Sequence, residues 1–238
     1  MKTLIKAKIP WILVPLLCLV VAGGAGVYLV MIRDSAAAPL ALRTDASLSR
    51  VASGTDINGQ WTVVPGNGDQ ATTAGYRVKE RVFGVGADTA TGRTHDVTGS
   101  VTVAGQRVTA AQFTVDMATL KSNKSLRDAV LKTAAIDTNK FPTAAFTLTD
   151  PIALPDITPG KVYTVDARGK LRLHGVSKSV SVTLRYEQTK TGFVLLADMP
   201  IVMADYSIKA PSAAGVVSVD DHGSFELLVD LAKRPPGN

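Results

Sequence analysis

Apolar side chains recur at every second position over most of the chain beyond residue 60. Between residues 76 and 82, for example, Tyr76, Val78 and Val82 alternate with the charged Arg77 and Lys79. A period of two puts one set of side chains on one face of an extended strand and is typical of half-buried β-strands. The same alternation recurs over residues 97–103, 113–117, 146–148, 171–173, 180–186, 193–195, 201–203 and 225–231. With residues 61–64 and a segment near residue 162, the sequence predicts eight to ten strands.

One segment has the helical period instead. In residues 122–135, "SNKSLRDAVLKTAA", the spacing of Leu126, Ala129, Val130 and Thr133 puts them on one face of a helix. Ser122 is the predicted N-cap, because its hydroxyl can accept a hydrogen bond from an early backbone N–H of the helix. The sequence therefore predicts one short helix among the strands.

Many antiparallel strands with a single helix predict a mainly β fold, either a barrel or a sandwich. We favour a single antiparallel barrel of about eight strands, because closure removes the exposed sheet edges. A barrel of this size is either filled by its own side chains or just wide enough to hold one small ligand. The predicted inward positions hold many valines and alanines and few large rings. This composition favours unfilled space inside the barrel.

The stretch "LRLHGVSKSVSVTL", which begins at Leu171, joins two of the predicted strands. Its apolar residues are odd-numbered before the turn and even-numbered after it. Pairing Leu173 with Val180, and Leu171 with Val182, brings all four side chains to one face of an antiparallel hairpin. This register leaves residues 175–178 as a four-residue loop.

The same turn contains a histidine, a serine and a lysine, which raises the alternative of an active site. A nucleophilic Ser177 would need a base within hydrogen-bond reach and a carboxylate to orient that base. No acidic residue lies between Arg168 and Tyr186, and the stretch has no Gly-x-Ser-x-Gly motif. We therefore predict a structural hairpin with His174 and Lys178 at the rim of the barrel or in solvent, and no enzymatic activity.

No metal or cofactor site is predicted. The three histidines, His95, His174 and His222, are widely separated and form no paired-histidine motif. Asp220, Asp221 and His222 do cluster, but a turn that uses Gly223 explains the same residues.

The N-terminal region has a different character from the rest. Residues 11–32 form an uncharged run of 22 residues, about 33 Å long as a helix, which matches the thickness of a bilayer core. We predict a retained single-pass anchor, with a cleavable signal peptide as the alternative because small residues follow Asp34. Three lysines precede the run, so residues 1–10 are predicted to be a cytoplasmic tail. Residues 33–59 are predicted to be a flexible linker and residues 60–233 the barrel, outside the cytoplasmic membrane.

Charge and cysteine content exclude further classes of function and of site. Four of the 26 basic residues precede Asp34 and none of the 20 acidic residues does, so the rest of the chain has a net charge of only +2. With aromatic residues at 5%, this balance argues against nucleic-acid binding. The only cysteine, Cys18, lies in the apolar run, so the predicted barrel has no disulfide and no cysteine ligand for a metal.

Five motifs together resemble those of the YceI-like family. They are "GRTHDVTGSVTV" from Gly92, "FTVDMATLKS" from Phe113, "KFPTAAFTLTD" from Lys140, "LRLHGVSKSV" from Leu171, and "DYSIKAPS" with "VSVDDHGSFELLV" near the end of the chain. The resemblance implies an extracytoplasmic lipocalin-like barrel that binds polyisoprenoid or related long-chain lipids in an apolar interior. Many family members carry histidines after the first strand, whereas this chain has "PGNGDQATTAGYRVKE", so head-group contacts made by those histidines are not expected here.

The predicted ligand is therefore an isoprenoid or other long-chain lipid held by bulky inward residues in the middle of strands. The alternative for each of them is that it simply fills the barrel, and for the whole domain that it is a ligand-free interaction module of the cell envelope. The oligomeric state is not predicted. The candidate ligand-binding residues are Val78, Val82, Phe113, Val115, Phe146, Leu148, Leu173, Leu184, Leu195 and Phe225.

Overall fold

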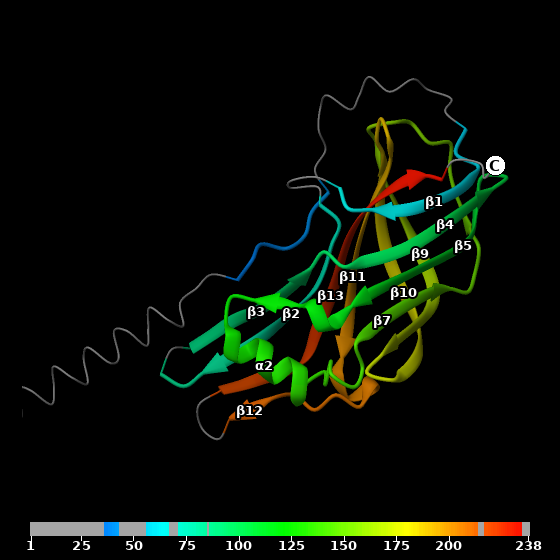
Figure 1. Ribbon diagram of the computed structural model, residues 1–238. Helices are drawn as coiled ribbons and strands as arrows, with labels where there is room; N and C mark the ends of the chain where they lie inside the picture. The colour runs from blue at the N-terminus through cyan, green and yellow to red at the C-terminus, as the bar shows by residue number, and fades with distance from the viewer. Residues whose placement is uncertain (1–35, 43–55, 67–70, 85, 214–216, 235–238) are drawn as a thin grey trace, which may run out of the picture. The chain divides into compact units, whose positions relative to one another are not determined.

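The computed structural model describes residues 36–42, 56–66, 71–84, 86–213 and 217–234 (Figure 1). The chain divides into two compact units, residues 1–35 and 36–238, and every described residue belongs to the second. Residues 11–32, the predicted anchor, lie outside the described part. Among the residues that are described, no helix combines the length and the apolar character needed to cross a bilayer.

Eight antiparallel strands form a closed barrel, as the sequence predicted (Figure 1). In the order in which they pair, they are β1 (Gly59–Val64), β4 (Val97–Ala104), β5 (Arg107–Asp116), β7 (Thr143–Leu148), β9 (Val162–Leu173), β10 (Val176–Gln188), β11 (Gly192–Val202) and β13 (Val217–Lys233). The first and last of these close the barrel, with Trp61 opposite Lys233 and Val64 opposite Asp230. Closure by this pairing reduces the edge that the barrel strands expose.

The longest described strand, β13, pairs with two different strands along the same edge. Its last residues pair with β1, whereas residues from Val217 to Leu228 pair with β2 (Thr73–Val82). Strand β2 forms a hairpin with β3 (Gly86–Thr94), and β3 pairs briefly with β6 (Lys121–Ser122). Two further short strands are β8 (Ile152–Ala153), on β5, and β12 (Ser212–Ala213), on β13.

The predicted turn at Asp221–Gly223 is wrong, because β13 continues through it. A register shift between Val219 and Gly223 marks a bulge, which leaves Asp220, Asp221 and His222 exposed at the surface. Extra residues at a bulge need no partner across the strand pair, so a polar insertion is tolerated there without ending the strand.

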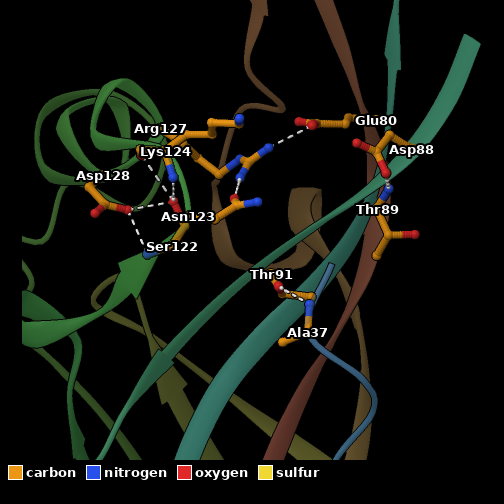
Figure 2. Close-up of polar contacts among 10 residues, drawn as sticks. All are labelled: Ala37, Glu80, Asp88, Thr89, Thr91, Ser122, Asn123, Lys124, Arg127 and Asp128. Carbon is orange, nitrogen blue, oxygen red and sulfur yellow. Dashed lines mark hydrogen bonds and ion pairs between the residues drawn. The ribbon is translucent and has the colours of Figure 1, made fainter. Parts of the chain in front are cut away.

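The predicted helix is present as α2 (Ser125–Thr133), but its cap differs from the prediction. The N-cap is Lys124, with no side-chain cap bond. Instead, Asp128 reaches back from the first turn of the helix, and its Oδ1 accepts from the backbone N–H of Ser122 (2.9 Å) and from the Ser122 hydroxyl (2.7 Å) (Figure 2). A carboxylate at this end of a helix is also favoured by the helix dipole.

The hairpin between β9 and β10 is confirmed, but its register differs. Leu173 lies opposite Val176 and Leu171 opposite Lys178, so the loop has two residues rather than four. His174 and Gly175 both have positive φ, 51° and 76°, as the tight type I′ hairpin turn requires. The shift from the predicted register is an even number of residues, so every apolar side chain stays on the predicted face.

Two clusters of apolar side chains face the interior of the barrel. The barrel cluster occupies the middle and one end, and includes Trp61, Phe113, Tyr186, Phe193 and Val229. The second, called here the α2-end cluster, lies at the other end of the barrel. It joins the strands to α2 and to the short helices η3 (Met117–Thr119) and η4 (Met203–Tyr206) through side chains that include Met117, Leu131, Leu173 and Tyr206.

Residues 36–42, inside the predicted linker, lie against the outer wall of the barrel; we call them the strap. The backbone N–H of Ala37 donates to Thr91 Oγ1 (3.2 Å), and Arg77 Nη2 donates to the carbonyl oxygen of Ala37 (2.6 Å) (Figure 2 for the first contact). Leu40 and Leu42 then pack on an outward-facing apolar patch of Val194, Leu196 and Leu228. The strap therefore covers apolar surface that would otherwise face water.

Candidate functional site

An apolar cavity of about 140 Å³ lies inside the barrel. One water molecule needs about 10–15 Å³ in the same measure, so this space is roughly ten times larger. The inward faces of the strands form its wall, and the lining includes no residue of α2, η3 or η4. The cavity therefore stops short of α2, where side chains of the α2-end cluster fill the barrel.

Seven of the ten candidate residues line this cavity. They come from β5, β7, β10, β11 and β13, and they are Phe113, Val115, Phe146, Leu148, Leu184, Leu195 and Phe225. On each strand the lining positions alternate with outward-facing ones, which is why a period of two in the sequence found them.

The other three candidates are placed differently. Val78 and Leu173 are buried in the α2-end cluster and do not border the cavity. Both face inward as predicted, but at their level helical segments supply side chains that occupy the interior. The side chain of Val82 lies outside the described part of the structure.

Several lining residues were missed by the sequence analysis. Trp61 and Phe193 meet edge to face, with ring centroids 4.8 Å apart, at one end of the cavity. Ile152, Leu154 and Ile157 line the same cavity from the connection between β7 and β9, which β8 holds against β5. This connection has too short an apolar alternation to be recognised as part of a barrel wall.

Glycines make room for two of the large rings. The Phe146 ring lies over Gly169, where an added Cβ would come within 2.4 Å of the ring. The Phe113 ring lies over Gly99 in the same way, at 2.6 Å. Because each ring occupies the space above a glycine on the neighbouring strand, it covers the wall and intrudes less into the interior. This pairing helps to leave unfilled space in a barrel that has aromatic side chains inside.

The cavity has almost no polar character. Glu226 borders it, but the carboxylate of Glu226 is bound by Arg77 and Arg93, and Arg77 also holds the strap. Among the described residues, no group of histidine, cysteine, aspartate and glutamate side chains is arranged to hold a metal ion. A space lined in this way suits a hydrocarbon and offers little to a charged ligand.

The turn that prompted the active-site alternative is structural. His174 Nδ1 donates to the carbonyl oxygen of Tyr206 (3.0 Å), and its ring lies edge-on to Phe141 with centroids 4.4 Å apart. Ser177 is exposed, and Lys178 pairs at the surface with Asp205. The histidine therefore fastens the hairpin to η4.

Two stacked tyrosines, of which Tyr186 lines the cavity, differ in the hydrogen bonds of their hydroxyl groups, which gives a matched test. Tyr163 and Tyr186 have ring centroids 5.5 Å apart. The Tyr163 hydroxyl accepts from the Thr158 N–H (2.8 Å) and donates to the Asp156 carbonyl (3.0 Å). The Tyr186 hydroxyl is buried and has no hydrogen-bond partner among the described residues, and burial raises the pKa of Tyr186 to about 12.

Tyr186→Phe is therefore expected to be neutral or stabilising by up to about 1 kcal/mol at pH 7, whereas Tyr163→Phe costs about 1 kcal/mol. Above pH 10 the unfolded chain ionises Tyr186 and the folded chain does not, so stability present below pH 10 is lost as the pH rises towards 12. Two pH units correspond to about 2.7 kcal/mol at most, and Tyr186→Phe should remove most of that loss. Chemical denaturation from pH 7 to 12 measures both effects. A larger loss at pH 7 for Tyr186→Phe than for Tyr163→Phe would contradict the assignment.

Comparison with known proteins identifies the family. Residues 61–231 match the YceI-like domain, and the chain therefore belongs to the YceI-like family. No curated protein sequence matches the chain.

A solved structure shares the fold, and two others are similar at lower TM-scores. A domain from Saccharophagus degradans, described as polyisoprenoid-binding and implicated in plant cell wall breakdown, is 17% identical, with a TM-score of 0.54 over 68% of this chain and 98% of that one. BcnA of Burkholderia cenocepacia is 18% identical, with a TM-score of 0.48 over 66% of this chain and 95% of that one. The YceI protein of Campylobacter jejuni is 14% identical, with a TM-score of 0.48 over 82% of this chain and 99% of that one. At these identities the likeness concerns the fold.

Proposed function

We propose that the barrel binds the chain of a long isoprenoid or a similar amphiphilic lipid in its apolar cavity. The observation that carries the proposal is the cavity itself, whose lining is apolar and contains seven of the residues predicted as ligand contacts. Each buried CH₂ contributes roughly 0.8 kcal/mol, so a long hydrocarbon chain binds there without a charged contact. Membership of the YceI-like family, and the polyisoprenoid-binding relative from Saccharophagus degradans, support the same ligand class.

The proposed role is to hold or carry the lipid and not to transform it. General acid–base or nucleophilic catalysis needs a titratable pair within hydrogen-bond reach of the substrate. The lining places Tyr186 and Glu226 beside the cavity, and the Glu226 carboxylate is already bound by two arginines.

The test is the mass of whatever co-purifies with the domain. Residues 36–238, which form one compact unit, are purified from the source organism without detergent and analysed by native mass spectrometry. We expect an added mass that organic solvent releases as a prenyl or similar long-chain lipid. Protein that is always ligand-free, and that also fails to take up an added polyprenol, would refute lipid binding and favour the interaction module instead.

We further propose that residues 11–32 anchor the chain in the cytoplasmic membrane, with the barrel outside. The length of the uncharged run, and the three lysines before it, support this orientation. Protease added to spheroplasts should degrade the barrel, and protection of the barrel would reverse the orientation. A mature N-terminus near Ala38 would show that the run is a cleaved signal.

A further inference from the structure

Large apolar side chains are exposed at one end of the barrel. Among the described residues, Phe83 is 81% exposed, Leu126 77% and Val202 37%, and these are the exposed large apolar side chains. Phe83 lies in the turn between β2 and β3, Leu126 in the first turn of α2, and Val202 at the end of β11. Leaving such side chains in water is costly, and apolar groups gathered in one region mark interaction surfaces.

Contacts show that the three side chains share the α2 end. Leu126 precedes Arg127, whose Nη2 lies 2.6 Å from Glu80 Oε1, and Glu80 is three residues before Phe83 on the same hairpin (Figure 2). Val202 leads directly into η4, which packs in the α2-end cluster together with α2. Two of the turns at the opposite end are polar: "GQ" joins β4 to β5 and "TKT" joins β10 to β11.

The strap runs along the outer wall with its first residues nearer to the β2–β3 turn than its last. Ala37 is bonded to Arg77, which lies opposite Ser224 of β13. Leu42 packs on the patch that contains Leu228, which is four residues further along β13 and further from the β2–β3 turn. The first residues of the strap therefore lie nearer to that turn than its last residues do.

The length of that preceding chain points to a membrane. The predicted membrane-spanning run ends at Ile32, five residues before Ala37. Five extended residues reach about 18 Å at most, whereas the whole predicted linker of residues 33–59 would reach about 90 Å. Docking of the strap thus shortens the predicted tether to the residues between Ile32 and Ala37, and Ala37 is held by Arg77 in the middle of β2.

We propose that the α2 end of the barrel rests on the lipid surface, with Phe83 and Leu126 inserted among the lipids. Lys79 and Arg81 are exposed beside the Phe83 turn, but Asp220 and Asp221 are exposed at the nearby bulge of β13. These four charges offset one another, and insertion of the two apolar side chains is the proposed basis of the contact. Exposure of Phe83 and Leu126 does not depend on ligand binding, whereas the short tether rests on the proposed anchor.

The test measures the depth of two matched turns in the membrane. Cys18 is the only cysteine, so Cys18→Ser gives a cysteine-free chain. Phe83→Cys in the β2–β3 turn and Ala104→Cys at the β4–β5 turn each carry a nitroxide in the full chain, reconstituted in nanodiscs of neutral lipid. We expect the label at 83 to be relaxed more by oxygen than by a water-soluble nickel complex, and the label at 104 to show the reverse. Two water-exposed labels, or a deeper label at 104, would overturn the proposal.

A second measurement does not need the anchor. Residues 36–238 are floated with neutral vesicles, as the unchanged domain and as the double variant Phe83→Ser, Leu126→Gln. Both side chains are exposed, so the fold should be kept, which circular dichroism checks. Each of the two substitutions is expected to weaken vesicle binding about tenfold. Equal binding by the two proteins, or no vesicle binding by the unchanged domain, contradicts insertion of these residues, whatever lipid the cavity holds.

Discussion

Glu226→Ala is expected to lower the free energy of unfolding by about 3 kcal/mol. Glu226 is only 4% exposed, and its carboxylate pairs with Arg77 Nε (3.2 Å) and with Arg93 Nη2. Removing one partner from a buried ion pair leaves the other charges poorly solvated. The expected loss in the free energy of unfolding is at the lower end of the range for broken buried ion pairs, because the two arginines keep partial access to water.

A glycine gives the Arg93 side chain the room to reach Glu226. Gly75 lies directly between Glu226 of β13 and Arg93 of β3 in the sheet register. An added Cβ on Gly75 would come within 2.8 Å of the Arg93 side chain, so only glycine lets the guanidinium cross to the carboxylate. The cluster also fixes the strap, because Arg77 donates to the carbonyl oxygen of Ala37.

Chemical denaturation of residues 36–238 at pH 7 measures the effect. The matched control is Asp205→Ala, which removes an exposed pair with Lys178 (3.4 Å) and should cost less than about 1 kcal/mol. Glu226→Ala should also speed proteolysis within the strap. Similar losses for the two variants would show that the Glu226 cluster contributes no more than a surface pair.

Ala197→Phe is expected to weaken lipid binding about 100-fold. Ala197 is buried on β11 between Leu195 and Met199, and all three line the cavity. A ring at this position would occupy part of the 140 Å³ space. Displacing three to four CH₂ groups of a ligand, at roughly 0.8 kcal/mol each, gives a loss of this size.

The same substitution on the surface provides the control. Ala110→Phe, at an exposed position of β5, should leave lipid uptake unchanged. Uptake of a polyprenol by each variant is measured by native mass spectrometry, and thermal unfolding confirms that both remain folded. Unchanged uptake by a folded Ala197→Phe domain would exclude this part of the cavity as the binding site.

Much of the candidate site was accessible from the sequence, because strand geometry alone separates inward from outward positions. Phe146 and Leu148, and likewise Leu184, were recognised by alternation and do line the cavity. Alternation carries no information about depth along the barrel, however. Leu173 was therefore indistinguishable from Leu184, although side chains near α2 bury it in a filled part of the interior.

The strand register and the path of the strap could also not be predicted from the sequence pattern. The β9–β10 loop has two residues because His174 adopts a positive φ, which non-glycine residues seldom do, and the predicted four-residue loop satisfied the same alternation. The strap belongs to a segment without periodicity. Its position depends on Arg77 and on an outward apolar patch, which come from distant parts of the chain.

Sequence patterns were enough to predict a mainly β chain with one helix, the two faces of each strand and the apolar character of the interior. These properties are local, because they follow from the two-residue repeat of an extended backbone. Packing in three dimensions was needed to show which inward side chains border free space and which fill it. That outcome depends on the volumes of side chains from eight strands, on rings that lie over Gly99 and Gly169, and on helical segments that occupy one end of the barrel.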